Sequence, residues 1–430
     1  MGDKFRPIAK NILTGVIILA AAVLAGFVLI TGVYLIPTGS IREHVKQSSS
    51  IIDEEGLMTY YLPWLGTTRR DNYTDCIMMS MAAYNGTGSL VYRAMTSNYV
   101  YVTEEQYYYE PGYLLRMLGP TDDGVSVEVS YSRYWHGYLV LLKPLLLVFD
   151  YGAIRIVNGV FQIIMLGLIM LEMVHDKKAK KMILPLLLVI FAINPVSAAM
   201  NMQFACIYNI TLVSLYVLFK THLFEKEHYW KMFMIIGIAA AFFDFLTYPL
   251  ACLGIPLIMM LVRWDEKSSE SIKATVFSCI SWGIGYAFMW ASKWILCDIL
   301  TGSSTIADAL NQVKERTVTD AYEVTGIRSD NILDVFGYNV EAFRDWLSFS
   351  VFAAAVVGIV LFAVIAKRKF KVNENTLIAL LLIAMIPFVW YAVLSNHSAI
   401  HSFMTYRNLT LTIMAVAGIL VSSISPKQAD

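Results

Sequence analysis

One stretch near the start of the chain decides how the rest is interpreted: Arg69-Arg70-Asp71-Asn72-Tyr73-Thr74-Asp75-Cys76-Ile77-Met78-Met79-Ser80-Met81. It lies in a long polar segment between one apolar run and a series of others. If a helix begins at Asp71, then Asp71 and Asp75 are four residues apart and share one face of that helix. The run after Asp75 is apolar enough to lay the helix on the surface of a bilayer.

Two carboxylates held just outside a lipid phase could perform acid–base chemistry. One of them could take a proton from a hydroxyl group, while Arg69 and Arg70 hold an anionic leaving group. A simpler interpretation is also open, in which Asp71 only caps a short helix and Asp75 is solvated. The rest of the chain bears on the choice between the two.

Composition places the chain among membrane proteins. Of its 430 residues 57% are hydrophobic and only 15% are charged, against about a quarter charged in soluble domains. The formal net charge is zero, so nothing favours nucleic acid as a partner. Five scattered cysteines form no C-x-x-C pair, which gives no sign of a disulfide framework or a zinc site.

Apolar runs predict an all-α polytopic membrane protein with about ten transmembrane helices. Tyr138–Phe149 is not counted, because about a dozen residues interrupted by Lys143-Pro144 cannot cross roughly 30 Å of hydrocarbon. We expect this run to lie in the interface; if it crossed, the basic run His175–Lys181 would fall outside the cell. The expected spans are 11–36, 152–174, 182–200, 204–222, 231–247, 249–263, 274–295, 344–366, 376–395 and 405–423.

With this topology Lys and Arg concentrate in short segments on one side of the membrane, among them 1–10, His175–Lys181 and Lys367–Lys371. By the positive-inside rule that side is the cytoplasm. Both termini, including Lys427, should therefore be cytoplasmic.

The chain is then expected to be a single membrane-embedded domain, residues 1–430, with two long external loops. The first loop, 37–151, carries the acidic motif and the interfacial helices, and the second loop, 296–343, covers the external face. The sequence has no internal repeat and no inverted pair of broken helices, which argues against a transporter.

Five short motifs follow one another along the chain, and their order resembles that of the GT-C superfamily of membrane glycosyltransferases. In pattern the chain is most similar to protein O-mannosyltransferases and to the aminoarabinose transferases of lipid A. The motifs are Asp71-Asn-Tyr-Thr-Asp75 in the first loop, Arg133-Tyr-Trp-His136 before the interfacial helix, Asp150–Asn158 at the next span, Ala192-Ile-Asn-Pro195, and Phe242–Pro249.

The chain also departs from the family pattern. Relatives often have adjacent acidic residues in the first loop, where this chain has Asn72 after Asp71. They often have another acidic residue beyond the third span, where this chain has Asn201 and Gln203. A Lys-Pro-Pro entry is replaced by the segment ending in His136.

The resemblance implies a glycosyltransferase that moves a sugar from a polyprenyl-phosphate donor to an acceptor hydroxyl on the external face. Asp71 or Asp75 would be the general base of an inverting single displacement, and the acceptor would be a cell-envelope polysaccharide or a glycolipid. A phosphate leaving group needs positive charge near its oxygens, although each outer cation could instead bind lipid headgroups. The candidates for donor-phosphate binding are Arg69, Arg70, Arg133, His136, Lys143, Arg155 and Arg407.

The expected lining of the pocket includes Gln203, Asp244, Tyr248, His397 and His401. His397 and His401 are four residues apart and could ligate a metal, but no third ligand is apparent, so a hydrogen-bonded wall is the preferred interpretation. No cofactor is expected with certainty, and a divalent cation is possible. Asp244 at membrane depth should line the cavity or be paired.

Two sequons, Asn72-Tyr-Thr74 and Asn85-Gly-Thr87, would carry glycans in a eukaryotic secretory membrane. A glycan on Asn72 would block the site, so a bacterial plasma membrane is favoured. Three alternatives stay open: a flippase or transporter of lipid-linked oligosaccharides, a polysaccharide polymerase with a polyprenyl-diphosphate donor, and a non-catalytic scaffold.

Overall fold

The computed structural model describes residues 2–317, 331–343, 345–365 and 373–424. Several features expected from the sequence lie outside the described residues. They are part of the second loop with Arg328 and Asp330, the basic run Lys367–Lys371, and Lys427.

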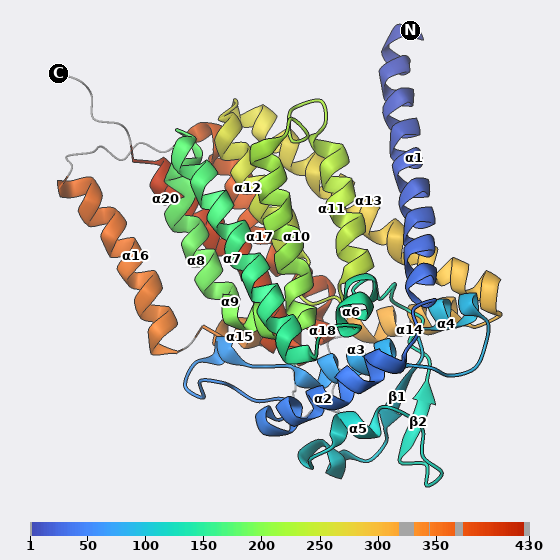
Figure 1. Ribbon diagram of the computed structural model, residues 1–430. Coiled ribbons are helices and arrows are strands. Elements are labelled where there is room, and N and C mark those ends of the chain that lie inside the picture. Colours follow the sequence, from blue (N-terminus) through green and yellow to red (C-terminus); the bar gives the residue numbers. More distant parts are fainter. Residues whose placement is uncertain (1, 318–330, 344, 366–372, 425–430) are drawn as a thin grey trace, which may run out of the picture.

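Most of the described chain is helical, and the long helices form a bundle (Figure 1). Among the described residues seven helices are long and apolar enough to cross a membrane, as a membrane protein with several spans requires. They are α1 (Gly2–Val33), α7 (Tyr151–His175), α10 (Met202–Lys220), α13 (Ser268–Thr301), α16 (Trp346–Ile365), α17 (Glu374–Val393), and the continuous segment Ser402–Ser422 with α19 (Ser402–Thr405), a 3-10 turn (Tyr406–Leu409) and α20 (Thr410–Ser422).

The three other expected spans are shorter. α11 (Tyr229–Phe243) and α12 (Leu250–Trp264) are apolar but have 15 residues each, a rise of about 22 Å. The expected span 182–200 is divided into α8 (Ile183–Ile193) and α9 (Pro195–Met200). The break falls at Asn194, which has a positive φ of 61° and precedes a proline, a position that disfavours helical backbone. The count of ten therefore stays a prediction.

The first loop forms a folded layer at one end of the bundle (Figure 1). Its only sheet among the described residues is the antiparallel pair β1 and β2, in which Tyr99 pairs with Val129, and the sequence did not predict it. The elements of the layer are α2 (Gly39–Glu55), a 3-10 turn (Gly66–Thr68), α3 (Asn72–Ala83), α4 (Leu90–Thr96), β1 (Tyr99–Val102), a 3-10 turn (Glu105–Tyr109), α5 (Tyr113–Arg116), β2 (Ser126–Val129) and α6 (Leu139–Leu146).

α6 is the run that was expected to lie in the interface. It has eight residues, about 12 Å, and lies in the loop layer, so it does not cross the bundle. α7 then runs to the opposite end, where Asp176 pairs with Arg263 at 2.9 Å. The start of α1 and the end of α20 lie at that same end (Figure 1). Which side of a membrane this end faces stays a prediction.

The second loop begins later than expected, because α13 continues past residue 296 to Thr301. It is partly helical, with α14 (Thr305–Thr317) and α15 (Ile332–Glu341). α13 also holds the first loop in place. The indole N–H of Trp294 donates to the Arg133 carbonyl at 2.9 Å, and buried Lys293 donates to the Met95 carbonyl at the end of α4 at 2.7 Å.

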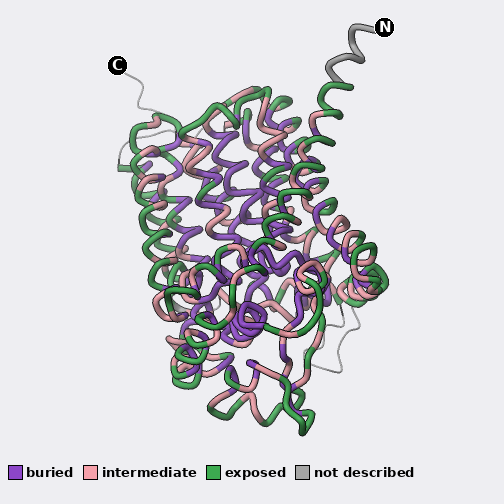
Figure 2. Tube along the Cα trace, turned by 45° about the vertical axis from the view of Figure 1, so that its right-hand side comes forward, coloured by how far each residue is buried: buried purple, intermediate pink, exposed green. Residues whose placement is uncertain are grey.

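Buried residues run through the bundle and continue into the loop layer (Figure 2). One apolar cluster is centred on α8, α10, α12, α17 and α20, and another joins α1, α3, α6 and α13. The outer faces of the long helices expose large apolar side chains, such as Ile163 at 73% and Val364 at 67%. A lipid environment accounts for that exposure.

Candidate functional site

Asp71 is the N-cap of α3, as the simpler interpretation of the sequence expected. Its carboxylate accepts hydrogen bonds from the Thr74 backbone N–H at 3.0 Å and from the Thr74 hydroxyl at 2.9 Å. The side-chain amide of Gln203 donates to the same carboxylate. Asp71 is almost completely buried. Burial raises its pKa, while the hydrogen bonds from Thr74 and Gln203 and the charge of Arg69 act in the opposite direction.

Asp75 lies one turn further along α3 and is fully buried, so the simpler interpretation is wrong on this point, since it had Asp75 solvated. Its carboxylate accepts from the Asn201 amide at 2.8 Å and from the Met202 backbone N–H at 3.1 Å. Burial raises its pKa to about 7, opposed by the nearby Arg155 charge and by hydrogen bonds from Asn201 and Tyr151. Asp75 therefore titrates near neutral pH.

Both carboxylates of α3 meet the first turn of α10. Asp75 contacts Asn201 and Met202, and Asp71 contacts Gln203. A helix N-terminus has free N–H groups and a positive end of its dipole, both of which favour negative charge. The first loop is thus fixed to the bundle at the two residues that the sequence motif singled out.

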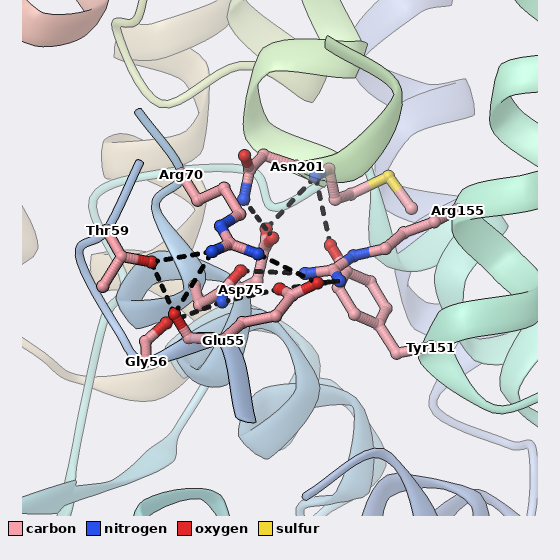
Figure 3. Close-up of polar contacts among 10 residues, drawn as sticks. Glu55, Gly56, Thr59, Arg70, Asp75, Tyr151, Arg155 and Asn201 are labelled. Carbon is pink, nitrogen blue, oxygen red and sulfur yellow. Dashed lines mark hydrogen bonds and ion pairs between the residues drawn. The ribbon is translucent and has the colours of Figure 1, made fainter. Parts of the chain in front are cut away.

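Glu55, the last residue of α2, organises the polar network around this contact (Figure 3). Its carboxylate pairs with Arg70 at 3.2 Å and with Arg155 at 3.0 Å. It also accepts from the Asn72 amide at 3.0 Å, and Arg155 donates to the Asn72 oxygen at 2.8 Å. Arg70 and Arg155 therefore share Glu55 as their ion-pair partner, so one carboxylate holds both guanidinium groups.

Asn72 is completely buried, and its amide nitrogen donates to Glu55 and to the Gly56 carbonyl at 2.7 Å. A glycan cannot be attached to it without breaking this network. Sequence reasoning missed Glu55, because it lies outside every motif and follows Asp53 and Glu54 in an acidic run that gives no sign of which member turns inward.

Three other candidate cations also have partners in the protein. Arg133 pairs with Asp308 of α14 at 2.7 Å. Buried Lys143 donates to the Ala82 carbonyl at the end of α3 at 3.2 Å, and burial lowers its pKa to about 8. His136 is buried, which lowers its pKa to about 3, so it is neutral at pH 7.

Arg69 and Arg407 are different, because neither forms an ion pair within the described part of the chain. The Arg69 guanidinium lies over the Phe403 ring at 4.3 Å. Arg407 is buried and donates to the Ile193 carbonyl at the end of α8 at 2.9 Å and to the Phe403 carbonyl at 3.2 Å. The two guanidinium groups therefore share Phe403 as a neighbour.

Arg316 of α14 adds a third cation, which the sequence did not single out. Its guanidinium approaches His397 Nδ1 at 3.5 Å and bonds Tyr134, and no carboxylate pairs with it among the described residues. Burial and, after it, the charges of Arg316 and Arg69 together lower the pKa of His401 to about 3. Arg69 and Arg316 therefore both lie within electrostatic range of His401.

Three residues that the sequence predicted to line the pocket, His397, Asp244 and Tyr248, form hydrogen bonds with backbone groups. His397 Nε2 donates to the Leu246 carbonyl at 2.8 Å, and the rings of His397 and His401 are 4.7 Å apart. Asp244 accepts from the Thr247 N–H at 2.9 Å, and the Tyr248 hydroxyl donates to the Phe204 carbonyl. No cluster of three His, Cys, Asp or Glu side chains suited to a metal occurs among the residues the structure describes.

A row of aromatic rings connects Arg316 with the helical bundle. Phe245 contacts Tyr134 and Tyr138 with ring centroids 5.3 and 5.1 Å apart, and it also contacts His136 at 5.3 Å. Tyr134 at one end bonds Arg316. Tyr138 at the other end lines a large cavity.

That cavity is an apolar groove of about 590 Å³ between α6, α7, α10 and α11. Met202, Tyr138 and Cys206 lie at its loop end, and side chains such as Val213 and Val217 continue it along α10. Asn158, Asn209 and Ser214 are its few polar members besides Tyr138. Since Met202 also donates its backbone N–H to Asp75, the groove ends at the acidic motif.

No protein-family model, no curated protein and no solved structure matches the chain. The resemblance to GT-C glycosyltransferases therefore rests on the sequence motifs.

Proposed function

We propose that the chain is a GT-C-type membrane glycosyltransferase that transfers a sugar from a polyprenyl-phosphate donor to an acceptor hydroxyl. The observation that carries this proposal is the apolar groove that ends at Met202, directly beside Asp75. A groove lined by apolar side chains on membrane helices suits a lipid chain. An acidic pair at its mouth suits chemistry on the group that the lipid carries.

The unpaired cations support the second part of the proposal. Arg69 and Arg316 are partly buried, both act electrostatically on His401, and neither forms an ion pair with a carboxylate among the described residues. Cations in this state favour the binding of an anion. A lipid phosphate supplies that charge. Arginine is suited to it because its fork of N–H groups can bind two phosphate oxygens together.

The proposed reaction is a single displacement at the anomeric carbon. The acceptor oxygen forms a bond to that carbon while the bond from the carbon to the phosphate oxygen breaks. The hydroxyl proton passes to Asp71, and polyprenyl phosphate leaves on the side of the arginines with inversion of configuration. Because Gln203 and Thr74 occupy the Asp71 carboxylate, one of these hydrogen bonds has to be exchanged when the acceptor binds.

Asp75 is assigned a positioning role. It has no exposed surface, and it fixes the start of α10 against α3. On the proposed topology the site faces the outside of a bacterial plasma membrane, and the acceptor is a glycan or a glycolipid of the cell envelope.

Incubation of the purified protein with polyprenyl-phosphate sugars tests the proposal. Release of polyprenyl phosphate together with a glycosylated acceptor is expected. Movement of an intact lipid-linked sugar across vesicle membranes without its cleavage would instead identify a flippase and reject the transferase.

A further inference from the structure

A second cavity, of about 330 Å³, lies in the loop layer between the end of α2, the turn after it, the start of α3 and the segment that leads into α5. It is separate from the apolar groove, with which it shares no lining residue. Its lining is dominated by aromatic rings and carboxylates: Tyr73, Tyr108, Tyr109, Tyr113, Asp53 and Glu110.

The tyrosine rings form a fixed aromatic wall. Tyr108 packs edge-on against Tyr73 and Tyr113, with ring centroids 5.7 and 5.4 Å away. The hydroxyl groups of Tyr108 and Tyr101 lie 3.1 Å apart, which holds the Tyr108 ring in place. Tyr109 is 91% exposed at the edge of the cavity. Aromatic surface is therefore present before any ligand binds.

The cavity is also acidic. Asp53 accepts from the Gly112 backbone N–H at 2.8 Å and from the Ser49 hydroxyl at 3.3 Å, and no ion pair involves it in the described part of the chain. Glu110 has only a distant cation, Arg116 at 4.0 Å, whose guanidinium lies over a neighbouring ring. No Lys or Arg lines the cavity.

These features select among ligand classes. An anion would be repelled by two carboxylates with no compensating cation in the lining. A neutral ligand could stack on the rings but would gain nothing from the charge of the two carboxylates. A cation would gain from the negative faces of the tyrosine rings and from both carboxylates together.

We propose that the cavity bounded by Tyr73, Tyr108, Tyr109, Tyr113, Asp53 and Glu110 binds an ammonium-bearing ligand. The ammonium group lies against the tyrosine rings, and its charge is balanced by Asp53 and Glu110. The inference goes beyond sugar transfer and does not depend on it, since it concerns a cavity that shares no lining residue with the apolar groove.

Calorimetric titration of the purified full-length protein tests this inference. Choline is compared with 3,3-dimethyl-1-butanol, which has the same shape without the charge, and glucosamine is compared with glucose. Each cation is expected to bind at least about tenfold more tightly than its neutral counterpart. Tighter binding of choline would point to a lipid headgroup as the source of the ammonium, and tighter binding of glucosamine to an amino sugar.

Matched variants localise the binding. Asp53→Asn keeps an oxygen for the Gly112 N–H but removes the charge, and it should weaken cation binding about five- to tenfold. Tyr108→Leu removes an aromatic ring from the lining and should weaken cation binding by a similar factor. Glu54→Gln removes a neighbouring exposed charge that does not line the cavity and should change the affinity less than about twofold. Equal binding of cation and neutral counterpart, tighter binding of glucose, or no effect of Asp53→Asn would each overturn the proposal.

Discussion

Glu55 offers a test of how the acidic motif is held in place. Its carboxylate pairs with Arg70 and Arg155, and the three side chains are only 17%, 12% and 9% exposed. Glu55→Gln keeps the shape and one acceptor oxygen but leaves two largely buried guanidinium groups without a counter-ion. Removing one partner of a buried ion pair costs about 3–5 kcal/mol, and the retained amide oxygen should hold the loss near about 3 kcal/mol.

The free energy of unfolding of the purified protein, measured by chemical denaturation in detergent, gives this loss directly. Glu54→Gln is the matched control, because it removes the same charge from an exposed neighbour and should cost less than about 0.5 kcal/mol. A double-mutant cycle with Arg155→Gln should give a coupling energy of about 1–3 kcal/mol. If Glu55→Gln were as stable as Glu54→Gln, the network would not hold the motif as described.

Three further predictions follow from the same geometry. Burial raises the pKa of Asp75 to about 7, so the folded protein retains a proton there that the unfolded chain loses near pH 4. The resulting contribution to stability is full below about pH 4 and is lost as the pH rises to 7. Asp75→Asn should therefore show a smaller fall in Tm between about pH 5 and 8 than the wild type. Arg69→Gln should lower kcat/KM for the donor tenfold or more, which corresponds to a loss of about 1.5–3 kcal/mol. Arg133→Gln should change kcat/KM little, because the Arg133 guanidinium is already paired with Asp308. Similar values for both variants would remove Arg69 from the donor site. Val213→Trp fills the apolar groove and should raise the KM for the lipid donor about tenfold with little change in kcat. Leu171→Trp lies on the exposed face of α7 and should leave this KM unchanged. Equal KM values for the two variants would exclude the groove as the lipid site.

The sequence predicted those parts of the structure that depend on local patterns. Apolar length predicted the seven helices that are long and apolar enough to cross a membrane among the described residues, and the short run with Lys143-Pro144 lies in the loop layer as expected. The spacing of Asp71 and Asp75 placed both on one helix, and the cap at Asp71 was foreseen. Each of these features is decided by residues close together in the chain.

The partners of the candidate residues could not be predicted in the same way. Glu55 is paired with Arg155 across 100 positions of the chain, and Arg133 is paired with Asp308 across 175. Whether a cation is free or neutralised depends on such long-range contacts, and sequence spacing does not record them. For the same reason Arg316 was not recognised, since it is the packing of α14 on α18 (Ser395–Ile400) that brings it to His397.

The central claim is that Asp71 is the base of a sugar transfer, and one measurement tests it most directly. Asn at this position keeps an oxygen for the Thr74 N–H, so the cap and the start of α3 should survive. It cannot accept a proton. In an assay of polyprenyl-phosphate release, Asp71→Asn should lose about 10²–10⁴-fold in transfer rate while its thermal stability stays near that of the wild type. Asp75→Asn should lose less. An Asp71→Asn protein with full activity would contradict the account.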